Sequence, residues 1–210
     1  SFPEASVAAA GDISLEDAVK LVTDFRSRLD ELNSQKEALT QSLESYRTSL
    51  DKVSHFTGLD YDLSSILHFK YIKFRFGRIA KEYYDKFYRY VYDSIDTVLY
   101  KCAEDSEYIW LVYFVPEGIC DRVDAIYASM HFERTFLPDE YEGTPMEAVS
   151  RLTARVSDLE AQLQSIESQI AAISESEKAG LLAANKRLAA FTKNFDIRKL
   201  AACTKHKDEH

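Results

Sequence analysis

The side chains that could do chemistry are dispersed along this chain and form no recognisable motif. The five histidines and three cysteines occur without an H-E-x-x-H sequence, a C-x-x-C pair or a His beside a Cys, so the sequence predicts no metal site. The six glycines stand singly, which excludes the glycine-rich loops that hold phosphates in nucleotide-binding folds. No G-x-S-x-G sequence presents a serine nucleophile. We therefore expect no catalytic residues, no metal and no cofactor, and we do not expect an enzyme.

The cysteines indicate a reducing compartment. Cys102, Cys120 and Cys203 are odd in number and widely spaced, which is not typical of a disulfide framework. A thiolate nucleophile at Cys102 or Cys120 would need a neighbouring base, and the sequence places none beside either residue.

Charge and composition exclude further classes. The 26 Lys and Arg residues against 35 Asp and Glu give a net charge of -9, which disfavours nucleic acid as a partner because the phosphate backbone would be repelled. No run approaches the roughly 18 apolar residues of a membrane helix, so we expect a fragment that does not insert into the membrane. Since the sequence starts at Ser1 without Met, we also expect it to be a piece of a larger parent.

The elements that position these side chains begin with a long helix over residues 14–57. Ser14 with Glu16 and Asp17 is typical of a helix start, and Gly58 is typical of a helix end. Apolar residues then recur in three- and four-residue steps, interrupted only at Lys36, which is the pattern of a coiled-coil seam. The seam residues are Leu15, Ala18, Val22, Phe25, Leu29, Leu32, Leu39, Leu43, Tyr46, Leu50 and Val53.

A second heptad helix is predicted over residues 144–200. Thr144, Pro145 and Glu147 are typical of its start, and its seam is interrupted at Glu177 by a stutter, with Gly180 close by. The seam residues are Val149, Leu152, Val156, Leu159, Leu163, Ile166, Ile170, Ile173, Leu181, Ala184, Leu188 and Phe191. The two helices are expected to pair antiparallel within one chain as a two-helix coiled-coil hairpin, the alternative being pairing with copies in other chains.

The intervening residues 58–143 are predicted to form an α/β lobe. Residues 69–76 alternate as a strand in which Ile72, Phe74 and Phe76 face inward and Tyr71, Lys73 and Arg75 face outward, and Gly77 allows a bend. The expected elements that follow are a helix over 80–96 with Tyr84, Phe87, Tyr88 and Val91 inward, strands over 97–102 and 108–115, a helix over 117–131 and a strand over 132–137. This β-α-β-β-α-β order predicts a ferredoxin-like lobe, hence an α+β fold class. Residues 1–13 and 201–210 are expected to be a flexible N-terminus and a tail.

The aromatic residues of the lobe have two interpretations. Tyr71 with Lys73 and Arg75 could form a base-stacking platform for RNA, but acids outnumber bases in the lobe and no RNA-binding consensus occurs. We therefore interpret the aromatic residues as core. The weak candidates for partner binding on the lobe surface are Lys73 and Arg75 on the strand and Lys81 and Arg89 on the helix.

Two runs of the chain resemble a known family. FRFGRIAKEYY (Phe74–Tyr84) and YIWLVYFVP (Tyr108–Pro116), lying between two heptad helices, are similar to the N-terminal cytoplasmic half of subunit I of bacterial and archaeal V-type (A-type) ATPases, whose eukaryotic counterpart is subunit a. The resemblance extends from about Leu15 to Leu200 and is closest to the distal lobe of that family with its coiled-coil stalk.

The resemblance implies a cytoplasmic stator part of a membrane-bound rotary ATPase. In such a machine the parent complex couples ATP hydrolysis or synthesis to H⁺ or Na⁺ transport, and the implied partner of this fragment is the helical E/G heterodimer of the peripheral stalk. The ion-translocating arginine of the family lies in a membrane half, so no translocation residue is assigned to this sequence. The alternative is a coiled-coil adaptor with a ferredoxin-like tip that is unrelated to ATPases.

Overall fold

The structure is a computed structural model that describes residues 13–138 and 141–194. It is an α+β chain with long helices and a four-stranded antiparallel sheet. The described residues form two compact units, one within residues 41–160 and the other over residues 13–40 and 161–194, so the long helices contribute to both. The expected tail over 201–210, the last residues of the second helical region (195–200) and nearly all of the expected N-terminal segment lie outside the described residues.

Helix α2 (Leu15–Ser54) begins where its sequence predicts. The Ser14 hydroxyl oxygen accepts a hydrogen bond from the Asp17 backbone N–H at 3.1 Å, and acidic side chains occupy the positive end of the helix. Each predicted seam residue is buried or half-buried, whereas most residues between them are exposed. Lys36, which interrupts the apolar seam, is itself half-buried and forms an ion pair with Glu167 at 3.7 Å.

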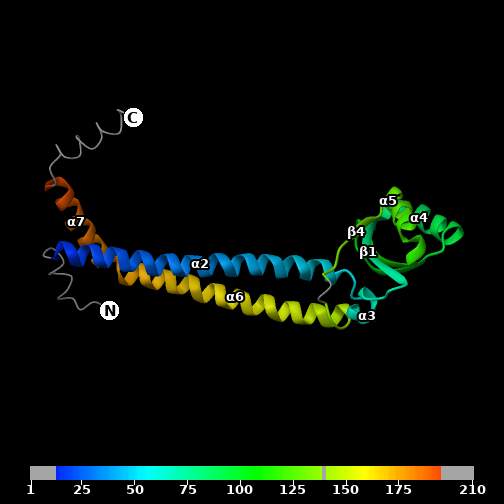
Figure 1. The fold of residues 1–210 in the computed structure, drawn as a ribbon, viewed down its shortest axis with the longest axis horizontal. Helices are drawn as coiled ribbons and strands as arrows, with labels where there is room; N and C mark the ends of the chain where they lie inside the picture. The colour runs from blue at the N-terminus through cyan, green and yellow to red at the C-terminus, as the bar shows by residue number, and fades with distance from the viewer. Residues whose placement is uncertain (1–12, 139–140, 195–210) are drawn as a thin grey trace, which may run out of the picture. The chain divides into compact units, whose positions relative to one another are not determined.

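The second helical region is divided. Instead of one helix over 144–200, the structure has α6 (Pro145–Ser176) and α7 (Lys178–Asn194), and α7 departs from the direction of α6 at Glu177 (Figure 1). The break coincides with the stutter, where the seam changes phase. The ion pairs Arg28–Glu177 and Lys36–Glu167 show that α2 and the returning chain run antiparallel here.

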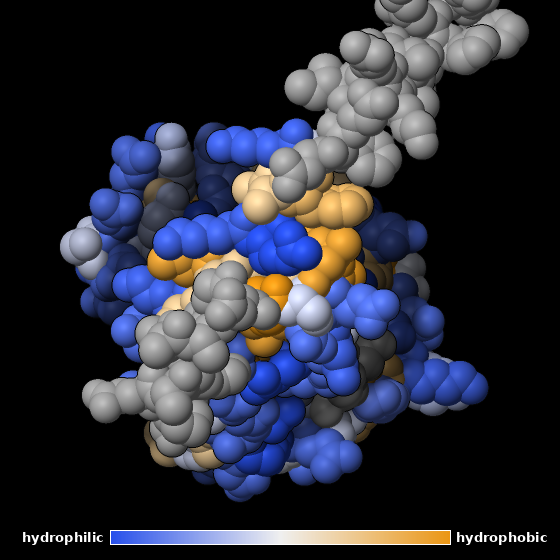
Figure 2. Space-filling model, turned by 90° about the vertical axis from the view of Figure 1, so that its left-hand side faces the viewer, coloured by the Kyte–Doolittle hydropathy of each residue, from blue (hydrophilic) through white to orange (hydrophobic). Residues whose placement is uncertain are grey.

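Gly180 brings α7 close to the first turns of α2. A Cβ atom at Gly180 would lie 3.1 Å from Leu21 Cδ2, so this glycine permits close packing. Leu21 lies outside the heptad seam and is half-buried by this contact. Among the described residues of this unit, Val19, Leu182 and Phe191 are large apolar side chains that are exposed. Figure 2, which faces the left-hand side of Figure 1, shows apolar side chains gathered in the middle of that face.

The lobe carries its strands and helices in the order β-α-β-β-α-β. The elements are β1 (Ile72–Ala80), α4 (Lys81–Ser94), β2 (Val98–Glu104), β3 (Tyr108–Pro116), the short η2 (Glu117–Ile119) with α5 (Cys120–Ser129), and β4 (Glu133–Thr135). The sheet order is β2-β3-β1-β4 with every neighbouring pair antiparallel. β1 pairs with β3 along its whole length, from Ile72↔Pro116 to Ala80↔Tyr108, but with β4 only over Phe76–Arg78.

Three details of the lobe differ from the sequence prediction. β1 starts at Ile72 and continues straight through Gly77, where a Cβ would lie 2.3 Å from Phe132 Cζ and 2.4 Å from the Glu133 carbonyl oxygen. Gly77 therefore allows β4 and Phe132 to approach and does not make a bend. The helix α3 (Leu63–Leu67) was not predicted; Asp62 caps it by accepting from the Ser64 N–H at 2.8 Å. Tyr88, expected to face inward from α4, is exposed.

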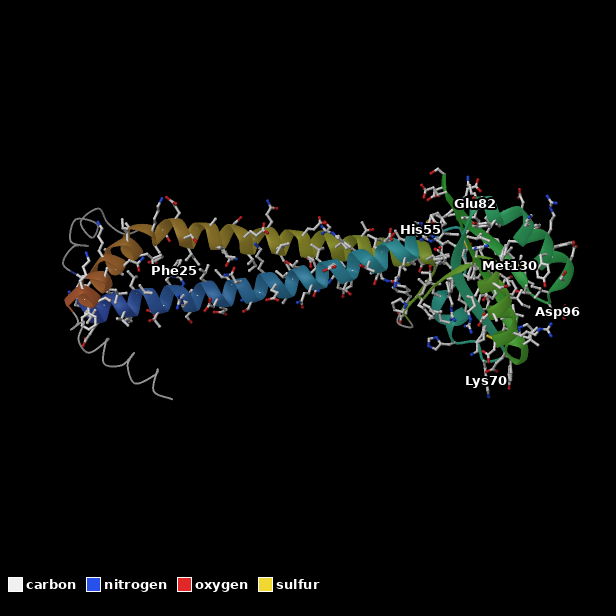
Figure 3. The ribbon with its side chains drawn as sticks, turned by 90° about the horizontal axis from the view of Figure 1, so that it is seen from above. Phe25, His55, Lys70, Glu82, Asp96 and Met130 are labelled. Atoms are coloured by element: carbon white, nitrogen blue, oxygen red, sulfur yellow. The ribbon has the colours of Figure 1, made fainter. Side chains whose placement is uncertain are left out.

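Both faces of the sheet are buried. Helices α4 and α5 cover one face with the buried residues Phe87, Val91, Val123 and Tyr127. The other face, which carries Phe76, Trp110 and Val112, packs against Val53, Phe56, α3 and Ala148 at the start of α6. His55, labelled in Figure 3, stacks on Trp110 with ring centroids 4.0 Å apart. The interpretation of the lobe aromatics as core is confirmed for Phe76 and Trp110, and the sheet face that carries them is not open to bases. Tyr71 lies before β1 and is exposed.

Candidate partner-docking site

The four predicted docking residues are not brought together. Lys73 and Arg75 lie on β1, whereas Lys81 opens α4 and Arg89 lies two turns further along that helix. Lys81 Nζ is 3.8 Å from Glu104 Oε1 in an exposed ion pair. Arg89 is exposed, and no acidic group among the described residues lies within ion-pair distance of it. Lys81 and Arg89 are therefore accessible charges on α4 that share no pocket with the strand residues.

Arg75 was predicted to face outward, but it does not face solvent. Its side chain lies on the sheet face that α5 covers, where Nε donates to Asp124 Oδ2 at 3.2 Å and Nη2 donates to Cys120 Sγ at 2.9 Å. The Tyr113 hydroxyl donates to the same Asp124 carboxylate. Strand alternation correctly separated Arg75 from Phe74 and Phe76, but the face chosen as outward is the one beneath α5.

The cluster of Arg75, Tyr113, Cys120 and Asp124 links β1 and β3 to α5 by hydrogen bonds and does not supply a reactive group. Burial, followed by the hydrogen bond with Asp124, raises the pKa of both the Cys120 thiol and the Tyr113 hydroxyl, so both keep their protons at neutral pH. Cys120, Asp121 and Asp124 place possible ligand atoms within 4.8 Å of one another. Because the Arg75 guanidinium already donates to Cys120 and Asp124, a cation occupies the place where a metal would bind these two groups.

Arg134 joins Lys73 and Arg75 around a groove at the β4 side of β1. It pairs with Gly77 across the β1–β4 ladder, which puts it on the same face as Arg75. The groove has a volume of about 340 Å³. Its lining residues are Ile66, Leu67, Lys73, Phe74, Arg75, Phe76, Arg134, Thr135, Phe136 and Leu137. Sequence reasoning missed Arg134 because its place beside Arg75 depends on the strand register, and the run 132–137 offers no signal for that register.

The positive charge of this groove is only partly compensated. Arg75 forms an ion pair with Asp124. Neither Lys73 nor Arg134 has an acidic group within ion-pair distance in the part of the chain that the structure describes. Lys73 Nζ donates only to the Phe69 carbonyl oxygen at 3.5 Å, and the Arg134 guanidinium stacks on Phe136 at 4.3 Å. Burial, and after it the like charge of Arg75, lowers the pKa of Arg134. A ligand carrying negative charge would relieve this repulsion.

A second groove lies between the end of α2 and the start of α6. It has a volume of about 530 Å³, and Ser42, Ser49, Tyr141, Arg151 and Arg155 are among its lining residues. Here the cations are already engaged, since Arg151 donates to the Glu142 carbonyl oxygen and Arg155 forms an ion pair with Asp158 at 3.1 Å. The groove beside β1 is therefore the better candidate for binding a charged partner.

Comparison with known proteins gives a likeness of fold to a solved structure. No protein-family model matches the chain, and no curated protein matches its sequence. A solved structure described as the cytoplasmic N-terminal domain of subunit I, homologue of subunit a, of V-ATPase matches with a TM-score of 0.58 and 16% sequence identity. The match covers 82% of this chain and 57% of that one, so this chain spans little more than half of the matched structure. None of the described helices is long and apolar enough to cross a membrane. The chain thus resembles the cytoplasmic N-terminal domain of V-ATPase subunit I in its fold, as the two sequence runs predicted.

Proposed function

We propose that the chain is a non-catalytic stator part of a membrane rotary ATPase and lies on the cytoplasmic face of the membrane. The observation that carries the proposal is the fold likeness to the cytoplasmic domain of V-ATPase subunit I over 82% of the chain. The runs Phe74–Tyr84 and Tyr108–Pro116 support the same family independently of the fold. In this proposal the lobe is ferredoxin-like, which its sheet order supports, and it is carried by a two-helix hairpin.

The proposed role is to dock the E/G heterodimer of the peripheral stalk and to resist torque. A stator must transmit force without yielding, and the sheet of this lobe is packed on both faces, which resists deformation. The paired helices add a seam whose ion pairs Lys36–Glu167 and Arg47–Glu160 help to fix the register. The docking residues we propose are the exposed cations Lys81 and Arg89 on α4 and, at a separate place on the lobe, Lys73 and Arg75 beside the groove.

Titration of the whole chain against a purified E/G heterodimer tests the proposal. We expect modest affinity that weakens with salt, because in the assembled machine several attachment points act together. Charge-removing variants of Lys73 and Lys81 locate the contact, and Lys20→Gln, at an exposed position near the start of α2, is a matched control.

Two results would separate this proposal from the adaptor alternative. A coiled-coil adaptor unrelated to ATPases would leave the E/G heterodimer unbound even at high micromolar concentration with both partners folded, and the stator proposal would then be withdrawn. Binding that is lost in the Lys73 and Lys81 variants but kept in Lys20→Gln would support docking through the lobe.

A further inference from the structure

One edge of the central strand β1 lacks a complete partner. β1 pairs with β3 through all nine of its residues, but on its other side β4 covers only Phe76–Arg78. Over residues 13–138 and 141–194, no backbone hydrogen bond joins residues 72–75 to the chain that follows β4. Since alternate residues of a strand direct their N–H and C=O groups to opposite edges, part of this backbone is available for pairing. The unpaired stretch spans roughly 13 Å at about 3.3 Å per residue.

The groove described above lies along this open edge. Its lining includes residues 73–76 of β1, Arg134–Leu137 from and after β4, and Ile66 and Leu67 from α3. β4 ends at Thr135, and Phe136 beyond it is 64% exposed, so the edge is left open just where β4 stops. The space beside residues 72–75 is thus in the position of a strand that β4 would have supplied had it continued.

The two sides of this edge differ in chemistry. Lys73, Arg75 and Arg134 lie on the face beneath α5, whereas Phe74 and Phe76 lie on the opposite face, where Phe76 packs edge-to-face on Phe56 at 5.1 Å. An added strand would present alternate side chains to these two faces. Acidic side chains at every second position would meet the cations, and apolar side chains at the positions between them would meet the half-buried Phe74, because Phe76 is already buried against Phe56.

We propose that the open edge of β1 takes up an extended segment of a partner protein whose side chains alternate between acidic and apolar. Charge complementarity selects this occupant, because Lys73 and Arg134 have no acidic neighbour at ion-pair distance among the described residues. Backbone pairing would supply affinity and the alternating side chains would supply specificity. A second copy of this chain, paired through the same edge, would bring two sets of these cations together and is disfavoured. The proposal concerns the chemistry of the groove and holds whichever complex contains the chain.

The test uses a fluorescent peptide of about seven residues that alternates Val and Glu, titrated against the whole chain by anisotropy. Binding is expected at concentrations below about 1 mM, accompanied by slower amide hydrogen exchange within residues 72–75. A peptide alternating Val and Lys, and a peptide with the same Val and Glu grouped in two blocks, are the matched controls. Both should bind much more weakly than the Val/Glu peptide. The Val/Lys peptide would be repelled by the cations of the groove, and the block-ordered peptide could not direct all its Glu side chains to one face of an added strand.

Variants of the chain assign the binding to the groove. Arg134→Gln is expected to weaken the Val/Glu peptide about tenfold, the size of one lost charge-assisted hydrogen bond. Lys73→Gln should also weaken binding of the Val/Glu peptide. If Arg134→Gln unfolds the lobe, the affinity of the Lys73→Gln variant tests whether the peptide binds in the groove. Lys86→Gln removes an exposed charge on α4 and should leave the affinity unchanged.

Three outcomes would overturn the proposal. These are no binding of the Val/Glu peptide at about 1 mM, equal binding of the block-ordered peptide, and unchanged exchange within residues 72–75 in the complex. Self-association of the free chain that slows amide exchange within residues 72–75 would assign the edge to a second copy instead. Because the peptide contains no stalk sequence, a negative result leaves the test with the E/G heterodimer standing.

Discussion

The two compact units bury their apolar residues in different ways. In the unit formed by residues 13–40 and 161–194, the buried side chains are those of Ala18, Ala183 and Ala184, and the larger seam residues are half-exposed or, at Phe191, exposed. In the other unit, large side chains such as those of Tyr113, Tyr127, Phe56 and Phe87 are almost completely buried. Two paired helices cover each other along one stripe only, whereas a sheet covered on both faces encloses its side chains.

This difference implies that stability is concentrated in the unit formed by residues 41–160, which contains the lobe. A half-exposed leucine in a two-helix seam removes less apolar surface from water than a buried phenylalanine, and it leaves a smaller cavity when truncated. Substitutions of similar chemistry should therefore have unequal effects in the two units.

The largest effect is expected at Phe56. Its side chain is fully buried against Phe76, so Phe56→Ala should lower the free energy of unfolding by about 3–5 kcal/mol. Leu29→Ala, in the half-exposed seam of α2, should cost about 1–2 kcal/mol. Urea unfolding of both variants measures the two losses in the free energy of unfolding, and Tyr92→Ala, at an exposed position, is the control. Equal costs at Phe56 and Leu29 would contradict the proposed concentration of stability.

The same contrast explains what the sequence could predict. The heptad spacing identified the seam of α2 from Leu15 to Val53, because a helical stripe is a local property of the sequence. Alternation along β1 also separated two faces correctly. It could not say that α5 would cover Arg75, or that Val53, Phe56 and Ala148 would cover Phe76, because these partners come from distant segments.

The groove was beyond sequence reasoning for a related reason. Lys73 and Arg75 were recognised as neighbours on one strand face, but Arg134 reaches them only through the register Gly77↔Arg134. A strand of three residues carries too little pattern to fix a register. The division at Glu177, by contrast, coincides with a stutter that the seam spacing had located.

A second test of tight lobe packing uses glycines. Gly77→Ala should destabilise the lobe by about 2–3 kcal/mol, since the added Cβ would meet the Phe132 ring at 2.3 Å and the Glu133 carbonyl oxygen at 2.4 Å. Gly118→Ala is the matched control, because no atom lies within 4 Å of its added Cβ. Thermal unfolding of the two variants should separate them clearly. If the Gly77→Ala protein were as stable as the Gly118→Ala protein, β4 and Phe132 would have to move away from β1 at little cost in free energy.

Buried tyrosine gives the lobe a dependence on alkaline pH. Burial raises the pKa of Tyr127 from 10.0 to about 12. Because the folded-state pKa is the higher one, the stabilisation is complete below pH 10 and is lost as the pH rises through 12, at a cost of about 2 kcal/mol. Tyr127→Phe should lose less stability over this range in denaturant titrations at stepped pH. The exposed Tyr92→Phe should behave like the unmodified chain, and a Tyr127→Phe profile that also matched it would refute the assignment.

The smallest effect is expected at Glu177, where a polar residue interrupts the apolar seam of the second helical region. Glu177 occupies a seam position, its side chain is only 17% exposed, and its Oε2 is buried with no hydrogen-bond partner among the described residues. Its other oxygen is 3.8 Å from Arg28 Nη1, too long to repay the desolvation of the carboxylate in full. Glu177→Leu should therefore raise the free energy of unfolding by about 1 kcal/mol, whereas Glu175→Leu, at an exposed position, should not.

Hydrogen exchange locates that effect. In the unmodified chain, amides around Glu177–Gly180 should exchange faster than those of Leu159–Ile170, because the break between α6 and α7 combines a polar seam residue with a helix-weakening glycine. Glu177→Leu should reduce the difference without abolishing it, since the helix-weakening Gly180 remains next to the break. Equal protection of the two segments in the unmodified chain would mean that the contact of Gly180 with Leu21 stabilises the break as firmly as the seam stabilises α6. The helical unit would then lack the weak point that distinguishes it from the lobe.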